Sequence, residues 1–547
     1  MKPASRTTPG WIARSGTALL LLTLTLACGG GERPGPAAEH TAEGDAHGPA
    51  RGGTAVLGSI TDVDAWNEYL SRQTFAVGLL RRVYLGLAQE LGDASDHPPS
   101  YAPLLAESWQ PSEDGLELTF RLREASWSDG EPIDAGDVRF TWQAQTSEHV
   151  PWIGADSKTR IRDVEIVDAR TVRFHFDGDY PHQFVDAIEG GILPEHVFGA
   201  VPFEGWKDHD WSAATVASGP FVPAAHRPGE QLELARNPHY FREGRPYFDR
   251  VVVRIVPDIS NLITQLRAGD IDYIENVPHW DARTLAGDPS LQIAPFSYAN
   301  YDFIGWNGAR APFDDAEVRR ALTMAIDRQA LVDELMAGHG AVGRGPAPSA
   351  WWGADPSLQP LPYDPEAARA ILRDKGFRTA EGEAGETLRL TLLTNAGNRT
   401  REDALVKIQA HLARIGVEAA IQPLEMRTMR GQVVSGDFDG YLGGWVFSGK
   451  VDLRGLFEST ATPPNGMNIV TYANPEVDAL FAELAEASSW DSMSPLLSRI
   501  QSRIATDQPY SFLYEAQRVA AHSSSLQGVR LDVPSDPLMH LADYWRL

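Results

Sequence analysis

The segment from Leu388 to Leu424 constrains the fold most, because it reads as a strand, a helix and a second strand without interruption. LRLTLL and VEAAIQPL have the composition of strands. Between them, apolar residues recur at helical spacing from Leu405 to Ile415, and Gly416 can end the helix. Two strands joined by a helix pair in parallel, so a parallel sheet is predicted in the C-terminal half.

The first third of the chain has a different pattern. LELTFRL, from Leu116 to Leu122, alternates apolar and polar residues as a strand with one buried face does. Two further alternating runs, between Val164 and Phe176, are joined around Asp168. This region is therefore predicted to form antiparallel strands, which makes the chain a mixed α and β protein.

A helix is predicted from Asp314 or Asp315, which can cap it, to Gly338, which can end it. Gly338, Gly340 and Gly343 then spell GxGxxG. A dinucleotide fingerprint must open a helix after a strand, whereas these glycines close one. They are therefore predicted to form a helix end and a loop, and no cofactor is expected.

The motifs of common enzymes are absent from the sequence. It contains no GxSxG, HExxH or CxxC. Its single cysteine, Cys28, excludes thiolate metal sites. No catalytic residue and no metal site are expected, although 74 acidic residues leave an accidental glycosidase pair open.

Length and charge restrict the class further. A chain of 547 residues exceeds what one hydrophobic core usually organises, so two or three domains are expected. Its net charge of −26 repels nucleic acid and anionic lipid surfaces, so no nucleic-acid partner is expected.

The N-terminus has the features of an export signal. Lys2, Arg6 and Arg14 precede an apolar run that ends at Ala27, too short to span a membrane. Cys28 follows at once, and LTLTLAC resembles a lipoprotein signal, in which this cysteine becomes the acylated N-terminus. The alternative is an ordinary cleaved signal with an incidental cysteine. The Gly-, Pro- and Ala-rich stretch that follows reads as a flexible tether, and the mature protein is expected to be soluble.

Several motifs occur together in a fixed order. Between Leu105 and Trp142 stand AESW, DGL, FRLRE, WSDG and DV. This segment closely resembles the signature of the family 5 extracellular solute-binding proteins, the peptide, dipeptide and nickel receptors of bacterial ABC importers. Further matches follow in the family's order: SGPF at Ser218, ARNPHYF at Ala235, LRAGDID at Leu266, APFDDAEVRRALTMAIDRQALV at Ala311, YDPEAARAIL at Tyr363, SGDFDGYLGGW at Ser435 and NIVTYANPEVDAL at Asn468.

The resemblance implies an α/β fold of the periplasmic-binding-protein type II class, cluster C, with two lobes and an extra domain. The chain would cross between the lobes repeatedly. The expected divisions are a signal peptide (1–27), a tether (28–52), domain I (53–66, 190–299 and 509–547), domain II (67–189) and domain III (300–508).

The same resemblance implies a function. The protein would be an exported, lipid-anchored monomer in the periplasm or at the cell surface. It would close its lobes on a small solute, a peptide or peptide-like molecule, and deliver it to an ABC permease with its ATPase. An oligosaccharide or other non-peptide solute is the alternative within the family; an enzyme and a signalling receptor are the alternatives outside it.

The expected binding site centres on the segment Gly440 to Leu453, GYLGGWVFSGKVDL. Trp445 and Phe447 alternate along a strand and are predicted to offer stacking surfaces to the ligand. In peptide-binding relatives an aspartate three residues after this tryptophan captures the ligand's amino group, but Ser448 stands there in this sequence. Asp452 is predicted either to replace that contact or to cap the following helix.

Other candidates come from their position in the family pattern. The remaining predicted ligand contacts are Trp66, Asn67, Ser218, Arg344 and Trp351. Trp109 and Trp127, by contrast, are predicted to pack inside domain II.

Replacing Cys28 with Ser is expected to abolish membrane attachment, because a hydroxyl cannot accept the acyl chains, and to leave the fold intact. Fractionation of cells that express the two forms measures this. An unchanged membrane fraction for Cys28→Ser would contradict lipid attachment at this residue.

Overall fold

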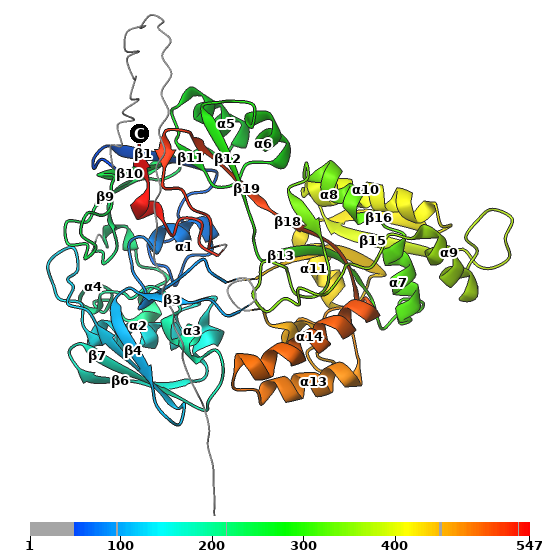
Figure 1. Ribbon diagram of the computed structural model, residues 1–547, viewed down its shortest axis with the longest axis horizontal. Helices are drawn as coiled ribbons and strands as arrows, with labels where there is room; N and C mark the ends of the chain where they lie inside the picture. The colour runs from blue at the N-terminus through cyan, green and yellow to red at the C-terminus, as the bar shows by residue number, and fades with distance from the viewer. Residues whose placement is uncertain (1–48, 95–96, 215, 448–450, 534) are drawn as a thin grey trace, which may run out of the picture. The chain divides into compact units, whose positions relative to one another are not determined.

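Three β-sheets contain most of the strands of the protein (Figure 1). The computed structural model describes residues 49–547, except residues 95–96, 215, 448–450 and 534. The predicted signal peptide, Cys28 and the tether as far as Gly48 lie outside the described residues.

A seven-stranded sheet combines three separate parts of the chain. Its order is β12-β19-β11-β1-β10-β9-β8, with β1 parallel to β10 and β11 and the other pairs antiparallel. The strands are β1 (Thr54–Ser59), β8 (Phe221–Arg227), β9 (Gln231–Arg236), β10 (Arg250–Ile255), β11 (Tyr273–Ile274), β12 (Leu291–Phe296) and β19 (Arg518–Ser523).

A four-stranded antiparallel sheet confirms the pattern predicted for the first third. Its order is β4-β5-β7-β6, formed by β4 (Ala106–Pro111), β5 (Glu117–Leu122), β6 (Ile161–Asp168) and β7 (Thr171–Phe176). Helix α2 (Ala135–Thr146) packs on β6 and β7. Trp127 is buried nearby and donates a hydrogen bond to Asp137, 3.0 Å away, while Trp109 packs against Phe184, so both tryptophans serve packing as predicted.

A six-stranded sheet contains the predicted β-α-β unit. Its order is β14-β18-β13-β17-β15-β16, from β13 (Asn300–Trp306), β14 (Gly340–Val342), β15 (Arg389–Asn395), β16 (Glu418–Leu424), β17 (Gly440–Val446) and β18 (Tyr510–Ala516). Strands β15 and β16 pair in parallel and α10 (Arg399–Ala413) connects them, which confirms the prediction.

Strands β18 and β19 run from one sheet into the other with only Gln517 between them (Figure 1). The sequence placed the whole segment from residue 509 in domain I, but β18 pairs with β13 and belongs to the six-stranded sheet. The physical reason is that β18 buries six of its seven residues there. The division into three domains stays a prediction.

The helix predicted from Asp314 or Asp315 to Gly338 is two helices, α7 (Ala316–Met324) and α8 (Arg328–Leu335). Asp315 caps the first as predicted. The prediction of one continuous helix is wrong because the Asp327 side chain accepts the Ala330 N–H and starts a new helix. Gly338, at φ +84°, follows α8 in the left-handed conformation that glycine adopts readily.

Shorter elements connect these sheets. Two small sheets pair β2 (Ala88–Glu90) with β3 (Tyr101–Pro103) and β20 (Leu526–Gln527) with β21 (Trp545–Arg546). The other helices are α1 (Thr74–Leu80), α3 (Gln183–Ile188), α4 (Glu195–Phe198), α5 (Ile259–Ala268), α6 (His279–Leu285), α9 (Pro365–Asp374), α11 (Met426–Val434), α12 (Leu453–Phe457), α13 (Pro475–Ala485) and α14 (Trp490–Asp507), with short 3-10 turns at Ala155–Lys158, Phe203–Gly205, Trp211–Ala213 and Leu541–Asp543.

Strand β13 is buried on both faces and lies inside the six-stranded sheet. Ile304 and Trp306 belong to one hydrophobic cluster, with α7, α8 and α10. Tyr301 and Phe303 belong to another, with α13 and α14. The sheet is thus covered by helices on each side, which gives its central strands a rigid position.

Three glycines in β17 are explained by close packing, most clearly Gly444. It pairs with Asp302 of β13, whose carboxylate accepts two hydrogen bonds from Arg401 at 2.8 and 3.0 Å. An ideal Cβ at Gly444 would overlap with both Asp302 and the Arg401 guanidinium. The ion pair therefore requires glycine at this place, next to Trp445.

Replacing Gly444 with Ala is expected to destabilise the protein by about 1–3 kcal/mol, because the added methyl displaces the Asp302–Arg401 pair. Denaturant unfolding measures the change. Gly431→Ala in α11 is the matched control: no atom lies within 4 Å of its ideal Cβ, and a gain of about 0.5–1 kcal/mol is expected. Equal effects of the two substitutions would contradict this account.

Candidate functional site

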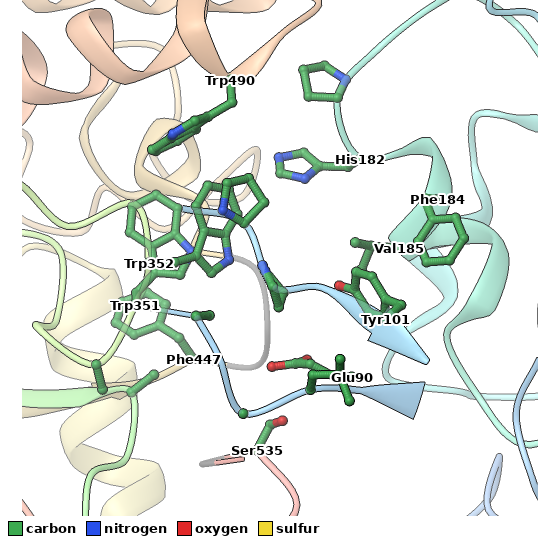
Figure 2. A pocket seen from close by; sticks show the side chains of 18 of the residues that line it. Glu90, Tyr101, His182, Phe184, Val185, Trp351, Trp352, Phe447, Trp490 and Ser535 are labelled. Atoms are coloured by element: carbon green, nitrogen blue, oxygen red, sulfur yellow. The ribbon is translucent and has the colours of Figure 1, made fainter. Parts of the chain in front are cut away.

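Two neighbouring cavities are lined by loops, by residues of α1, α3, α14, β2 and β3, and by Val446 of β17. The first, here called the aromatic cavity, has a volume of about 550 Å³ and is shown in Figure 2. Its wall includes Trp351, Trp352, Trp490, Phe184 and Phe447. A volume of this size suits a small organic ligand, and its rings can stack on one.

The second cavity, here called the arginine cavity, has a volume of about 580 Å³. Four arginines line it: Arg72, Arg81, Arg82 and Arg242. The two cavities share part of their lining, namely Glu90, Tyr101, Val185, Tyr298, Phe447 and Ser535. The two cavities are therefore adjacent, and these six residues lie at their common boundary.

The chain crosses between the two larger sheets beside the aromatic cavity. Residues 297–299 connect β12 with β13, and all three line this cavity. Phe447 follows β17 of the six-stranded sheet, and its N–H donates to the Ala299 carbonyl at 2.8 Å. Glu90 of β2 and Tyr101 of β3 pair directly with each other, and both line the aromatic cavity. The cavity is thus built from segments far apart in the sequence.

The predicted stacking residues have different surroundings. Phe447 lines both cavities, and its ring lies 5.7 Å from that of Tyr301. Trp445 is half-buried, lies parallel to Phe303 at 6.2 Å and donates a hydrogen bond to the Tyr510 hydroxyl at 3.3 Å. Phe447 therefore faces the cavities, whereas Trp445 supports the strand that holds it.

The polar candidates of the same segment lie elsewhere. The Asp452 side chain accepts the Gly455 N–H at 3.1 Å and caps α12, which confirms the capping prediction. Ser448 and Lys450 lie outside the described residues.

The remaining candidates divide into one cavity residue and four others. Trp351 lines the aromatic cavity. Trp66 donates to His226 at 3.1 Å, Asn67 accepts the Tyr69 N–H at 3.0 Å, Ser218 accepts the Leu85 N–H at 2.9 Å, and Arg344 donates to the Pro356 carbonyl at 3.3 Å. None of these four residues lines either cavity, although Leu85, the partner of Ser218, lines the arginine cavity.

Comparison with known proteins decides the family. The model of the bacterial extracellular solute-binding proteins, family 5, matches residues 100–466. The chain belongs to this family. It is 30% identical to the oligopeptide-binding protein AppA of Bacillus subtilis, over 97% of this chain and 99% of that protein. It is 27% identical to the probable D,D-dipeptide-binding periplasmic protein DdpA of Escherichia coli, over 78% and 81%.

A solved structure of a relative agrees with the fold of this family 5 protein. The structure of AppA from Bacillus subtilis in complex with a nonapeptide matches with a TM-score of 0.71 and 29% identity, over 91% of this chain and 100% of that one. The predicted fold class is confirmed: α/β, periplasmic-binding-protein type II, cluster C, with several domains. Among the described residues, no helix is long and apolar enough to cross a membrane.

Glu90, Tyr101, Trp352 and Trp490 line the aromatic cavity of this family 5 protein but were not predicted. Glu90 and Tyr101 lie on strands of three residues, too short for a periodic pattern. The rings of Trp352 and Trp490 are in contact, with centroids 4.8 Å apart, although the two residues are distant in sequence. The type of residue was the only signal available for Trp352 and Trp490, because tryptophan rings suit a stacking surface.

The charges of the arginine cavity are partly neutralised by its own acids. Arg81 lies 3.2 Å from Glu68, and Arg82 is buried 2.5 Å from Asp536. Glu90 differs from these acids, because no hydrogen bond or ion pair to its carboxylate is found among the described residues. Burial raises the pKa of Glu90 from its ordinary 4.5 to about 7, with nearby Arg81 opposing the shift.

The raised pKa of Glu90 predicts that this residue lowers the free energy of unfolding by an amount that depends on pH. Between pH 4.5 and 7 the folded state binds more protons at Glu90 than the unfolded state, so stability falls as pH rises and the full cost is present above pH 7. Glu90→Gln is therefore expected to raise stability at pH 8 by about 1–2 kcal/mol, allowing for solvent screening, and to have little effect near pH 5.

Denaturant unfolding at pH 5 and pH 8 measures this difference. Glu483→Gln is the matched control, because the exposed Glu483 carboxylate lies 3.8 Å from Arg499 and lines neither cavity. A stabilisation by Glu90→Gln of equal size at the two pH values would contradict the shifted pKa.

Proposed function

We propose that this family 5 protein is an extracytoplasmic receptor that captures a peptide and delivers it to an ABC importer. The observation that carries the proposal is the adjacent pair of cavities, one aromatic and one rich in arginine, which share the lining residues Phe447 and Glu90. The names of its relatives support a peptide: one is an oligopeptide-binding protein whose structure contains a nonapeptide, and another is a probable D,D-dipeptide-binding protein.

Peptides carry apolar side chains and both signs of charge, and the two cavities offer partners for each. Apolar side chains would pack on Trp351, Trp352 and Phe447. Carboxylates would approach Arg72 and Arg242, whose side-chain hydrogen bonds among the described residues go to neutral oxygens of Pro151 and Gln89. Charge-assisted hydrogen bonds of this kind are stronger than neutral ones.

Closure of the lobes would convert binding into a signal for the permease. The crossings at residues 297–299 and at Gln517 are short, so small changes in their backbone angles would move one sheet relative to the other. A ligand that contacts Phe447 together with Glu90 and Tyr101 would favour the closed state through its differential affinity. We propose that the ABC permease and its ATPase recognise that state.

An oligosaccharide is the second candidate ligand, and one observation favours it. Trp351, Trp352 and Trp490 form a connected group of rings, with centroids 5.2 and 4.8 Å apart. Such a surface suits the flat faces of sugar rings. A neutral sugar, however, leaves Arg72, Arg242 and Glu90 without charged partners, so a peptide fits the two cavities better.

Further parts of the proposal concern the protein as a whole. We propose that it catalyses no reaction and uses no cofactor, acts as a monomer, and is attached to a membrane only through acylated Cys28. We also propose the three domains with the bounds expected from the sequence, except that β18 pairs with β13 of domain III.

Thermal unfolding with and without candidate ligands tests the proposal. A peptide at 100 times its Kd is expected to stabilise the protein by about 2.7 kcal/mol. Phe447→Ala is expected to weaken binding by about 1–2 kcal/mol, or 5- to 30-fold, because it removes a ring that lines both cavities.

Trp280→Ala is the matched control for loss of an aromatic ring. Trp280 lies on α6 with 53% of its surface exposed and lines neither cavity, so its replacement is expected to leave affinity unchanged. Stabilisation by oligosaccharides and by no member of a broad peptide library would overturn the peptide proposal in favour of the second candidate.

A further inference from the structure

Glu90 occupies the boundary between the two cavities. It is the last residue of β2, and it lines the aromatic cavity and the arginine cavity alike. Figure 2 shows its carboxylate on the same side of the cavity as the Tyr101 ring and below the group of tryptophans. A ligand that extends through both cavities must therefore pass this side chain.

The charged groups around Glu90 have partners of their own. Arg81, at the end of α1, pairs with Glu68, and Asp536 of the C-terminal segment pairs with Arg82. Asp93, beyond β2, accepts the Ser100 N–H at 3.0 Å. In the part of the chain that the structure describes, none of these groups bonds to the Glu90 carboxylate, so this half-buried acid has room for an external partner.

We propose that Glu90 binds a primary ammonium group of the ligand at the boundary of the two cavities. This inference rests on the proposed peptide function and adds to it the residue that selects the ligand's charge. An ammonium here would make a charge-assisted hydrogen bond with the carboxylate and lie among the rings of Tyr101 and Phe447. It would supply, from another part of the chain, an acid in place of the one that the sequence lacks at Ser448.

The electrostatics around Glu90 agree with this role. Desolvation raises the pKa of Glu90 to about 7, and Asp93 and Asp536 add to the shift, while Arg81 reduces it. Tyr101 of β3 faces the same group, and its own pKa is raised by burial and by Glu90. A bound ammonium favours the ionised carboxylate, so binding near pH 7 is expected to release protons.

Lysine-free short peptides, each with a free or an acetylated N-terminus, provide the main test. In the unsubstituted protein, the free form is expected to bind at least about 10-fold more tightly than the acetylated form. Glu90→Gln is expected to reduce that ratio to about 3-fold or less, with the acetylated peptide affected little. Glu483→Gln is the control that removes an exposed carboxylate and is expected to keep the ratio.

Acetylated peptides with one lysine separate the two sources of an ammonium. Binding as tight as that of the free-amine peptides, and lost in Glu90→Gln, would assign the site to a lysine side chain as well as to the N-terminus. Calorimetry in two buffers of different ionisation enthalpy adds a second readout. Proton release is expected at pH 7 and not at pH 8.5, with affinity falling by up to about tenfold per pH unit below 7.

Three outcomes would overturn the inference. If peptides bind the Glu90→Gln variant with an unchanged preference for a free amine, the peptide function is supported and the role of Glu90 in binding the ammonium group is contradicted. A preference that is lost in Asp452→Asn and kept in Glu90→Gln would transfer the role to Asp452. Failure of every peptide, free or acetylated, to bind the unsubstituted protein would overturn the inference together with the proposed function.

Discussion

The structure depends on a chain that leaves one sheet and enters the other within very few residues. β12 and β13 are separated by residues 297–299, and β18 and β19 only by Gln517. Because β13 and β18 pair with each other inside the six-stranded sheet, both crossings start from the same rigid pair of strands. The Phe447 N–H bonds to Ala299 in one of these crossings, so the ligand platform and the connection between sheets are one assembly.

The place of β17 in that assembly explains why the residues around this strand pack so closely. Gly440, Gly443 and Gly444 leave room for Trp306, Tyr441 and the Asp302–Arg401 pair, all of which hold β17 against its neighbours. Trp445 then rests on Phe303 and Tyr510, which fixes the direction in which the chain continues to Phe447. Trp445 therefore positions the chain: β17 ends at Val446, and Phe447, beyond the end of the strand, lines the cavities whereas Trp445 does not.

Sequence reasoning succeeded where the signal was local. The β-α-β unit around α10, the hairpin of β6 and β7, and the cap at Asp452 each follow from the spacing of a few residues. It failed at Asp327, where a capping side chain interrupts an apolar period that otherwise continues. Trp351 and Phe447, two of the predicted ligand contacts, line the aromatic cavity. Glu90 was not predicted, because its environment is created by α1, β3 and the C-terminal segment rather than by its sequence neighbours.

The contrast between Glu90 and the other buried charges gives the site its polarity. Arg82 and Asp536 lose their hydration together and compensate each other at 2.5 Å, so neither offers a free charge to a ligand. Glu90 is desolvated without such compensation, and the folded protein holds this unfavourable arrangement through the stability of its surroundings. An uncompensated acid between a set of rings and a set of arginines distinguishes the two directions along the cleft. In the binding mode proposed above, electrostatics would therefore orient a ligand with a cation and an anion before its side chains contact the aromatic cavity.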